Sequence, residues 1–256
     1  MKSEIAFPVR VPPGRLRTGT GEAYRHELKY RISEAEQAAL EVRLAPLLRR
    51  DAHAKNGGYL IRSLYFEDLW NSAYEEKDAG VLVRRKYRIR IYDCSDAVIR
   101  LERKKKVDSF ICKEDASLTR EELERILRGD YTFLLTSPQA LCREFYYECT
   151  SKLLRPRVIV DYEREPWVLE EGTVRVTFDR NIRAAVGSWD LFDPHLPTLP
   201  VLEPGILVME VKFTEFLPQF VRELLPPKAQ EWTAVSKYVL CCDKTAYCHG
   251  FSGWRD

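Results

Sequence analysis

One short stretch of the chain, residues 84–90 with the sequence RRKYRIR, limits the possible folds more than any other. Its aromatic and β-branched residues favour a strand, and its cations stand at every second position: Arg84, Lys86, Arg88 and Arg90. Side chains alternate between the two faces of a strand, so these four cations share one face. Because like charges repel each other and gain nothing from a hydrophobic core, that face lies either in water or against a multivalent anion.

The same alternation in other strand-like segments favours the anion. Charged residues alternate in three further segments: Arg25, Glu27 and Lys29; Arg100, Glu102 and Lys104; Glu210 and Lys212. A sheet with charge on one face in strand after strand, and apolar residues on the other, is typical of a closed barrel with a polar interior. We therefore predict an α+β fold, with an eight-stranded antiparallel β-barrel, flanking helices and C-terminal helices.

The net charge and the number of cysteines exclude several classes of protein. With 41 basic and 39 acidic residues the formal net charge is only +2, which argues against a general nucleic-acid or anionic-membrane binder. No apolar run approaches the ~20 residues that cross a bilayer, and no signal peptide is recognisable, so we expect a cytoplasmic protein. Seven cysteines without a CxxC pair fit reduced thiols, and the group Cys241, Cys242, Cys248 and His249 lacks the spacing of a zinc site.

We expect one domain over residues 23–256, preceded by a flexible arm at 1–22 that contains proline and glycine without periodicity. Alternating patterns predict eight strands, at about 23–31, 59–67, 81–92, 97–106, 108–114, 156–164, 173–181 and 206–213. Helices are predicted after two capping boxes, Ser33 with Glu36 and Thr119 with Glu122, and at about 137–154, 217–225 and 234–247. The proline-rich segment 187–205 is expected to be a long surface loop, either a lid or padding.

Eight short motifs follow one another along the chain: RHELKY, SLYFED, KYRIRIY, LERKKK, DYERE, RVTFDRNIR, MEVKF and SKY. Together, from about residue 24 to 247, they resemble the polyphosphate polymerase domain of the vacuolar transporter chaperone (VTC) family. That domain belongs to the CYTH-like triphosphate tunnel metalloenzymes, which implies an antiparallel eight-stranded barrel lined with charge. The inositol-phosphate-sensing domain and the membrane helices of larger family members have no counterpart here, so the chain resembles the stand-alone bacterial form.

The resemblance implies roles for individual residues. Six cations would bind the triphosphate of a nucleotide or the growing chain: Lys29, Arg88, Arg90, Lys104, Arg164 and Arg180. Further substrate contacts would come from Tyr162, Lys212, Ser236 and Lys237. The metal, Mn²⁺ or Mg²⁺, would be held by Glu210, with Glu27 and Glu102 as additional candidates. Arg25 replaces the first glutamate of the wider ExExK pattern, which leaves fewer carboxylates for that metal.

Several of these assignments have an alternative in the sequence itself. Arg85 and Arg103 have the opposite parity to the inward positions, so we expect them on a solvated face. A β-bulge could move Lys104 to the surface, and Tyr162 could pack in a core instead of contacting phosphate. Arg180 shares its face with an apolar residue two positions earlier, which conflicts with an inward position. A structural role is equally open for Glu27, Glu102 and Ser236.

The implied reaction is a metal-dependent phosphoryl transfer from the γ-phosphate of ATP to a polyphosphate chain. Substrate would be clamped by Lys29, Arg88, Arg90, Arg164 and Arg180, with the metal on Glu210. The implied ligands are ATP, polyphosphate, tripolyphosphate or pyrophosphate, and a membrane protein is a candidate partner. Two alternatives stay open: a tripolyphosphatase or nucleoside triphosphatase that uses the same tunnel, and a non-catalytic sensor of polyphosphate or nucleotide.

Overall fold

The structure is a computed structural model, and it describes residues 25–54, 57–107, 110–170, 173–214, 216–225 and 235–246. The predicted arm at 1–22 lies outside the described residues, as do Cys248 and His249. The other six cysteines are free thiols, as expected for reduced cysteines.

Eight strands form one antiparallel sheet in the order β1, β10, β8, β7, β3, β4, β5, β6. Their bounds are β1 His26–Ser33, β3 Tyr59–Glu67, β4 Val83–Tyr92, β5 Ser95–Val107, β6 Phe110–Leu118, β7 Arg155–Leu169, β8 Val174–Ala185 and β10 Ile206–Phe213. The eight predicted strands are therefore confirmed. Two short strands that the sequence did not predict, β2 (Arg49–Arg50) and β9 (Thr198–Pro200), pair with β7 and β8.

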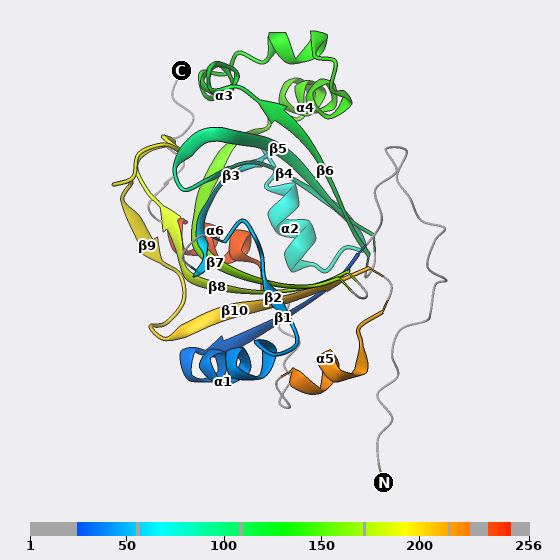
Figure 1. The fold of residues 1–256 in the computed structure, drawn as a ribbon. Coiled ribbons are helices and arrows are strands. Elements are labelled where there is room, and N and C mark those ends of the chain that lie inside the picture. The colour runs from blue at the N-terminus through cyan, green and yellow to red at the C-terminus, as the bar shows by residue number, and fades with distance from the viewer. Residues whose placement is uncertain are drawn as a thin grey trace.

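The sheet curls until its edge strands, β1 and β6, meet at one residue pair (Figure 1). The amide of Arg25 donates to the carbonyl of Ile111 (2.9 Å), and the amide of Ile111 donates to the carbonyl of Arg25 (3.0 Å). Arg25 and Ile111 both lie at the start of their strands. Since β1 and β6 are antiparallel, they leave this pair in opposite directions and, within the described part of the chain, make no further contact as neighbours in the sheet. Over the described residues no continuous ladder joins the two edges, and the closed barrel that we predicted is instead a curled sheet joined at one point.

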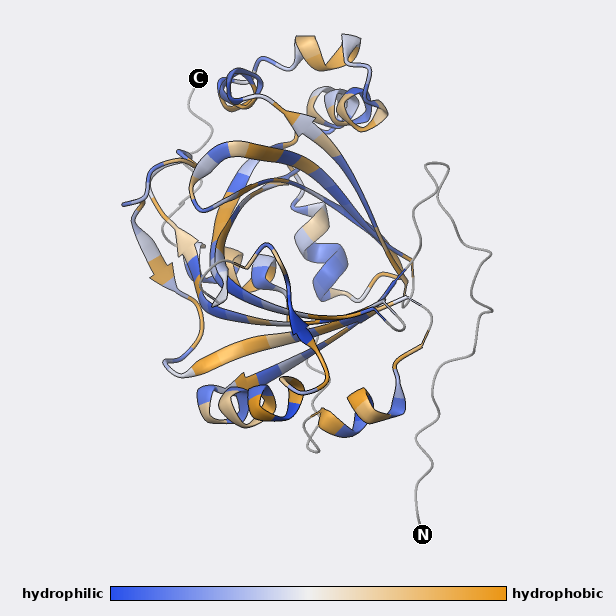
Figure 2. Cartoon of the chain, viewed as in Figure 1, coloured by the Kyte–Doolittle hydropathy of each residue, from blue (hydrophilic) through white to orange (hydrophobic). Residues whose placement is uncertain are grey.

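Helices cover the outer face of the sheet on two opposite sides (Figure 1). On one side α3 (Arg120–Leu127), the 3₁₀ helix η2 (Thr132–Thr136) and α4 (Ala140–Ser151) pack on β3 to β6. On the other side α1 (Glu34–Leu44) and α5 (Gln219–Leu224) pack on β1, β10 and β8. Both predicted capping boxes are present at the starts of α1 and α3. Along the strands, hydrophobic residues that face these helices alternate with hydrophilic ones (Figure 2).

Two further helices lie against the inner, concave face of the sheet. Helix α6 (Lys237–Thr245) buries Tyr238, Cys241 and Cys242 against inward side chains of β3, β7, β8 and β10. Helix α2 (Ser72–Asp78), which the sequence did not predict, contacts β3 and β4. The carboxylate of Glu67, at the end of β3, accepts hydrogen bonds from the α2 amides of Ala73 (2.9 Å) and Tyr74 (3.0 Å).

The expected surface loop at 187–205 is fastened to the outer face of the curled sheet. Leu191 and Leu196 are buried in the core beneath α3 and α4. The guanidinium of Arg62 is buried, pairs with Asp161 (2.8 Å) and donates to the carbonyls of Leu191 (3.1 Å) and Asp193 (2.6 Å). These contacts fit padding better than a lid, because the loop contributes to a core.

Candidate functional site

Charged side chains from several strands and from α6 gather on the inner face of the sheet. We call this group the inner cluster; it consists of Glu27, Lys29, Arg88, Arg90, Glu102, Lys104, Arg164, Asp179, Glu210, Lys212 and Lys237. Most of its side chains have little exposure, so their charges must be compensated locally. The alternation of charge in the sequence brings them together, because alternate residues of each strand face inward.

Glu210 on β10 lies at the centre of four cations. Its Oε1 accepts from Lys237 Nζ at 2.8 Å, and Lys29 Nζ lies 3.6 Å away. Its Oε2 lies 3.0 Å from Lys212 Nζ and 3.3 Å from Arg164 Nη2. Burial alone would raise the pKa of the Glu210 carboxyl, but the surrounding cations hold that pKa well below its usual value. Glu210 is therefore ionised at any physiological pH.

Asp179 on β8 is a second buried carboxylate, and the sequence analysis did not identify it. It accepts two hydrogen bonds of 2.7 Å from Arg164, a bidentate pair, and lies 2.6 Å from Lys237 Nζ. Tyr162 completes this side of the cluster, since its ring lies 5.2 Å from the Arg164 guanidinium and its hydroxyl accepts from Arg90 at 3.2 Å. Tyr162 thus both packs and contacts cations. Asp179 orients Arg164 and Lys237 toward the inner space.

Strands β3 to β6 supply the opposite side of the cluster. Arg88 donates to Glu102 Oε2 at 2.6 Å and to the hydroxyl of Tyr65 at 2.7 Å. Glu102 also lies 2.8 Å from Lys113 on β6, and Arg90 Nη1 is 3.8 Å from its Oε2. Burial opposes the ionisation of Glu102, but Arg88 and Arg90 outweigh it and lower the pKa of this carboxyl. The sequence did not indicate Tyr65 or Lys113 as parts of the cluster.

A contact between β1 and β5, which are not neighbours in the sheet, spans the inner space. Lys104 Nζ lies 2.7 Å from Glu27 Oε2, and Lys29 Nζ lies 3.1 Å from Glu27 Oε1. The bulge that could have turned Lys104 to the surface is therefore absent. Burial lowers the pKa of the Lys104 ammonium to about 8, although Glu27 acts in the opposite direction.

Arg180 does not join the inner cluster. It has the same parity as Phe178, which is buried in the outer core, and its guanidinium pairs with Glu165 at 3.0 Å while remaining 42 % exposed. The next residue, Asn181, has a φ of 50° at a register shift between β7 and β8, so the inward parity changes only after Arg180. The inward arginine of this strand is Arg175, which donates to the hydroxyl of Tyr59 at 3.0 Å.

Three further residues can now be compared with the expectations from the sequence: Ser236, Arg103 and Arg85. The hydroxyl of Ser236 accepts from the amide of Val239 at 3.4 Å, so its visible role is to cap α6. Arg103 was expected on a solvated face but is buried, because Glu114 (2.8 Å), Glu144 of α4 and the hydroxyl of Tyr87 enclose it. That expectation was wrong, since α4 covers this part of the sheet. Arg85 remains partly exposed and pairs with Glu148 at 2.8 Å.

The three carboxylates predicted to hold a metal do not converge. No three metal-ligating side chains come together in the part of the chain that the structure describes. Glu102 lies with Arg88 and Lys113, whereas Glu27 and Glu210 both contact Lys29 Nζ. Two carboxylates fit an ion such as Mg²⁺ or Mn²⁺, which keeps several waters and takes other oxygens from a bound phosphate. They do not form a cage of protein ligands.

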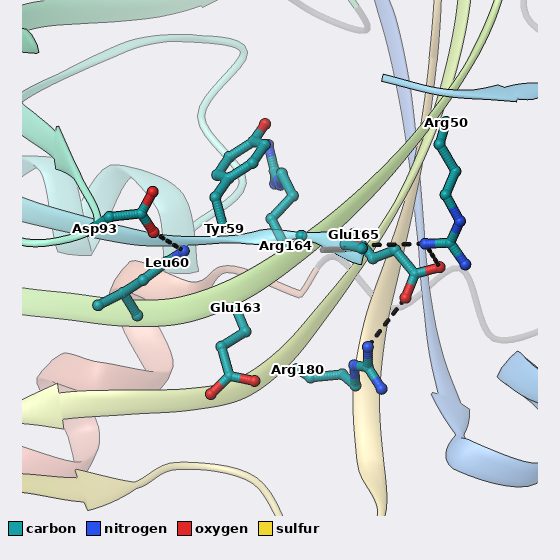
Figure 3. Close-up of a pocket in the computed structure, with 10 residues that line it drawn as sticks. Arg50, Tyr59, Leu60, Asp93, Glu163, Arg164, Glu165 and Arg180 are labelled. Atoms are coloured by element: carbon teal, nitrogen blue, oxygen red, sulfur yellow. Dashed lines mark hydrogen bonds and ion pairs between the residues drawn. The ribbon is translucent and has the colours of Figure 1, made fainter. Parts of the chain in front are cut away.

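A pocket of about 690 Å³ adjoins the cluster where β3 begins (Figure 3). It is lined by Arg50, Gly57, Gly58, Tyr59, Leu60, Asp93, Glu163, Arg164, Glu165 and Arg180. Figure 3 shows Arg50 and Arg180 both paired with Glu165, at 2.7 and 3.0 Å. The acidic residues of the lining balance its arginines, so the pocket is a less favourable place for an anion than the inner cluster.

Comparison with known proteins agrees with this geometry. A solved structure from Hippeastrum, an adenylyl cyclase candidate with a dominant triphosphatase activity, matches with a TM-score of 0.50 at 14% identity, over 87% of this chain and 96% of that one. An adenylate cyclase candidate from Bacillus halodurans matches with a TM-score of 0.47 at 12% identity, over 84% and 94%. The fold is that of the CYTH-like triphosphate tunnel proteins.

The VTC domain family matches residues 24–246, and the chain belongs to this family. The resemblance carried by the eight motifs is thereby confirmed. No curated protein sequence matches the chain. Within the described ranges, no helix is both long and apolar enough to cross a membrane.

Proposed function

We propose that this chain binds linear phosphate chains along the inner cluster and transfers the γ-phosphate of ATP to the end of a polyphosphate chain. The observation that carries the proposal is the set of cations that β1, β4, β5, β7, β10 and α6 present on the concave inner face of the sheet, where most of them are buried. One cation cannot neutralise a multivalent phosphate chain, whereas cations from several strands can. ATP, tripolyphosphate and pyrophosphate are the expected small ligands.

The arginines of the cluster are suited to phosphate oxygens. A planar guanidinium can bind two oxygens at once, and Arg88, Arg90 and Arg164 each present one. Glu102 holds Arg88 in place, and Asp179 holds Arg164 in place. Because the two guanidinium groups are already oriented without substrate, binding does not have to pay for ordering their side chains. Phosphoryl transfer depends mainly on alignment and charge neutralisation. The acceptor oxygen of polyphosphate is already anionic, so no general base is required.

Glu210, together with Glu27, would hold the divalent ion if Mn²⁺ or Mg²⁺ takes part. Both carboxylates are buried and face the same ammonium, Lys29 Nζ, at 3.6 and 3.1 Å. Bound there, the ion would supply positive charge beside the reacting phosphate. Glu102 is engaged with Arg88 and Lys113 and is not included in this metal proposal.

The test is to incubate the purified protein with ATP and Mn²⁺ and to size the products on a gel. A ladder of phosphate polymers that grows with time supports the polymerase. Release of inorganic phosphate without polymer would instead support a tripolyphosphatase or nucleoside triphosphatase at the same cluster. That second candidate is favoured by the dominant triphosphatase activity of the Hippeastrum protein, although this likeness concerns the fold. A cytoplasmic location and a membrane-protein partner remain predictions.

A further inference from the structure

Lys237 reaches the inner cluster from α6, whereas the other cations of the cluster belong to strands. Its Nζ lies 2.6 Å from Asp179 and 2.8 Å from Glu210, and the side chain is buried. The hydrogen-bonded ladder of the sheet places each cation that a strand carries. The place of Lys237 depends instead on how α6 is held against the inner face of the sheet.

Two kinds of contact hold α6 in this place. Apolar packing buries Tyr238, Cys241 and Cys242 against the inner side of the sheet. Such packing is not directional, so by itself it does not fix the rotation of the helix about its axis. A hydrogen bond is directional, and the hydroxyl of Tyr238 donates one to the carboxylate of Glu67 at the end of β3.

The two contacts at the start of α6 point to different parts of the sheet. Lys237 and Tyr238 are consecutive residues, so their side chains leave the helix about 100° apart. Lys237 reaches Asp179 on β8 and Glu210 on β10, whereas Tyr238 reaches Glu67 on β3. Together these anchors fix the rotation of the first turn. Without the bond from Tyr238, the first turn and the Lys237 ammonium would be less firmly placed.

Glu67 differs from the carboxylates of the inner cluster in how its charge is balanced. It is 5% exposed, and among the residues that the structure describes no cation forms an ion pair with it. Its oxygens accept hydrogen bonds from the amides of Asp68 (3.3 Å), Ala73 (2.9 Å) and Tyr74 (3.0 Å) and from the hydroxyl of Tyr238. The carboxylates of the inner cluster all pair with cations. Glu67 is therefore an acceptor shared by two helices and not a counterion of the cluster.

A further hydrogen bond joins the two helices directly. The hydroxyl of Tyr74 on α2 donates to Asp243 on α6 at 2.6 Å, and the amide of the same tyrosine donates to Glu67. The end of β3, α2 and α6 are thus connected by hydrogen bonds, and three of these bonds to the helices end on the carboxylate of Glu67. A change at Glu67 would therefore reach α6, which carries Lys237.

Accepting the proposed function, we infer that Glu67 is a positioning residue, which through the hydroxyl of Tyr238 fixes α6 so that Lys237 contacts the phosphate chain. Glu67 does not itself bind substrate, because its oxygens are occupied by the amides of α2 and by Tyr238. Its effect on phosphate binding therefore passes through Lys237.

The experiment is a double-mutant cycle on Tyr238 and Lys237, with the affinity for tripolyphosphate measured by calorimetric titration at one ionic strength. Lys237→Met removes a charge-assisted contact and should weaken binding about tenfold. Tyr238→Phe breaks the bond to Glu67 and should weaken binding about threefold or more. In protein that already carries Lys237→Met, Tyr238→Phe should change the affinity by less than about twofold, because Lys237 is no longer there to be positioned.

Tyr87→Phe is the matched control. Tyr87 is buried in the outer core, and its hydroxyl accepts a hydrogen bond from Arg103 at 3.3 Å. The substitution should lower the melting temperature, as Tyr238→Phe does, but leave the affinity for tripolyphosphate within about twofold. An equal loss of affinity from Tyr238→Phe with and without Lys237 would overturn the positioning role, and so would no loss in the presence of Lys237.

Hydrogen exchange without ligand separates this inference from the proposed function. Tyr238→Phe should raise the exchange of the amides of α6, whereas Tyr87→Phe should not. A wild-type protein that does not bind tripolyphosphate would refute the proposed function. Unchanged exchange of α6 in Tyr238→Phe would instead refute the positioning of this helix by Glu67.

Discussion

Arg88 and Arg90 differ from their neighbour Arg85 in what surrounds their guanidinium groups. The first two face the inner cluster, whereas Arg85 faces Glu148 on the outside. We predict that Arg88→Ala and Arg90→Ala each weaken tripolyphosphate binding about ten- to a hundred-fold, the effect of losing one charge-assisted contact. Arg85→Ala should change it little. Calorimetric titration measures the effect, and equal losses from both faces would contradict the inward register.

Arg103 is unsuited as a control, although its parity alone would have recommended it. It is buried between Glu114 and Glu144, so its removal would leave carboxylates without their partner and lower the stability of the fold.

Glu210 is the residue whose substitution best separates a metal role from a purely electrostatic one. Its charge balances Lys29, Arg164, Lys212 and Lys237. We predict that Glu210→Gln lowers the melting temperature, because these cations lose their shared anion, while tripolyphosphate binds as tightly or more tightly. If Glu210 also holds the metal, turnover should be lost across a full Mn²⁺ titration. Wild-type turnover in the variant at ordinary metal concentrations would remove Glu210 from the mechanism.

Lys86 provides a pH dependence that overlaps that of Lys104, whose pKa is about 8, and that a substitution can separate from it. Its ammonium has a pKa of about 7, lowered by burial. The groups that face it are Glu67 on β3, Lys77 on α2, Arg84 on β4, Lys104 on β5, and Tyr238 and Cys242 on α6. Below this pKa the lysine is charged and attracts phosphate; above it the charge is lost. Polyphosphate affinity should therefore fall as pH rises through about 7 to 8, and Lys86→Arg, which stays protonated, should remove the part of this fall near pH 7 and leave the part near pH 8 that Lys104 contributes. An unchanged slope in titrations of the variant would contradict the assignment.

The sequence located most inward residues because alternation on a strand is a local rule. Arg88, Arg90, Lys104 and Glu210 lie where parity placed them. Arg180 lies outside the cluster, as its shared face with Phe178 indicated, because the change of parity at Asn181 comes only after it; the resemblance, not the alternation, implied an inward position. The importance of Asp179 and Tyr65 depends on partners from other strands, and no local pattern encodes those contacts.

Among the elements, α2 and α6 contribute most to the inner side of the sheet and were the hardest to place. Helix α2 begins after Asn71, which has a left-handed conformation, and the carboxylate of Glu67 on β3 accepts hydrogen bonds from its first amides. The sequence therefore contains neither a capping box nor a long periodic pattern that would predict this helix. Helix α6 was predicted, and the resemblance implied that Ser236 and Lys237 at its start contact substrate, but the packing of the helix against the inner face was not evident from its own residues. It is fastened there by the apolar side chains of Tyr238 and its neighbours.

The hydroxyl of Tyr238 joins the two inner helices, because it donates to the same Glu67 carboxylate that caps α2. We predict that Tyr238→Phe destabilises the protein by about 1–3 kcal/mol, since the buried Oε2 of Glu67 loses one of its two donors and keeps only the amide of Tyr74. Denaturant unfolding measures the loss, and hydrogen exchange should rise in α2 and α6 before it rises in the outer helices. Tyr147→Phe, on the exposed face of α4, is the matched control and should change stability by less than about 0.5 kcal/mol. Equal effects of the two substitutions would show that Glu67 does not couple the helices.

At the scale of the whole molecule, the curled sheet brings like charges from opposite edges into one space. The formal net charge of only +2 hides this arrangement, because the cations are concentrated inside and their carboxylates compensate them unevenly. Folding therefore includes a repulsive term that an anion inside the sheet would remove. Local patterns could not predict the order in which the strands pair, because that order depends on contacts between strands that are far apart in the sequence.

The last prediction follows from this repulsion. Tripolyphosphate binds only the folded protein, so a hundredfold excess over its dissociation constant should add about 2.7 kcal/mol to the free energy of unfolding. For a domain of this size that corresponds to a rise in melting temperature of about 5–10 °C. Sodium chloride at the same ionic strength screens all charges alike and should raise it much less. A thermal scan with both salts decides the matter: if they shift the transition equally, the arginines face bulk solvent and the inner face is not a phosphate site.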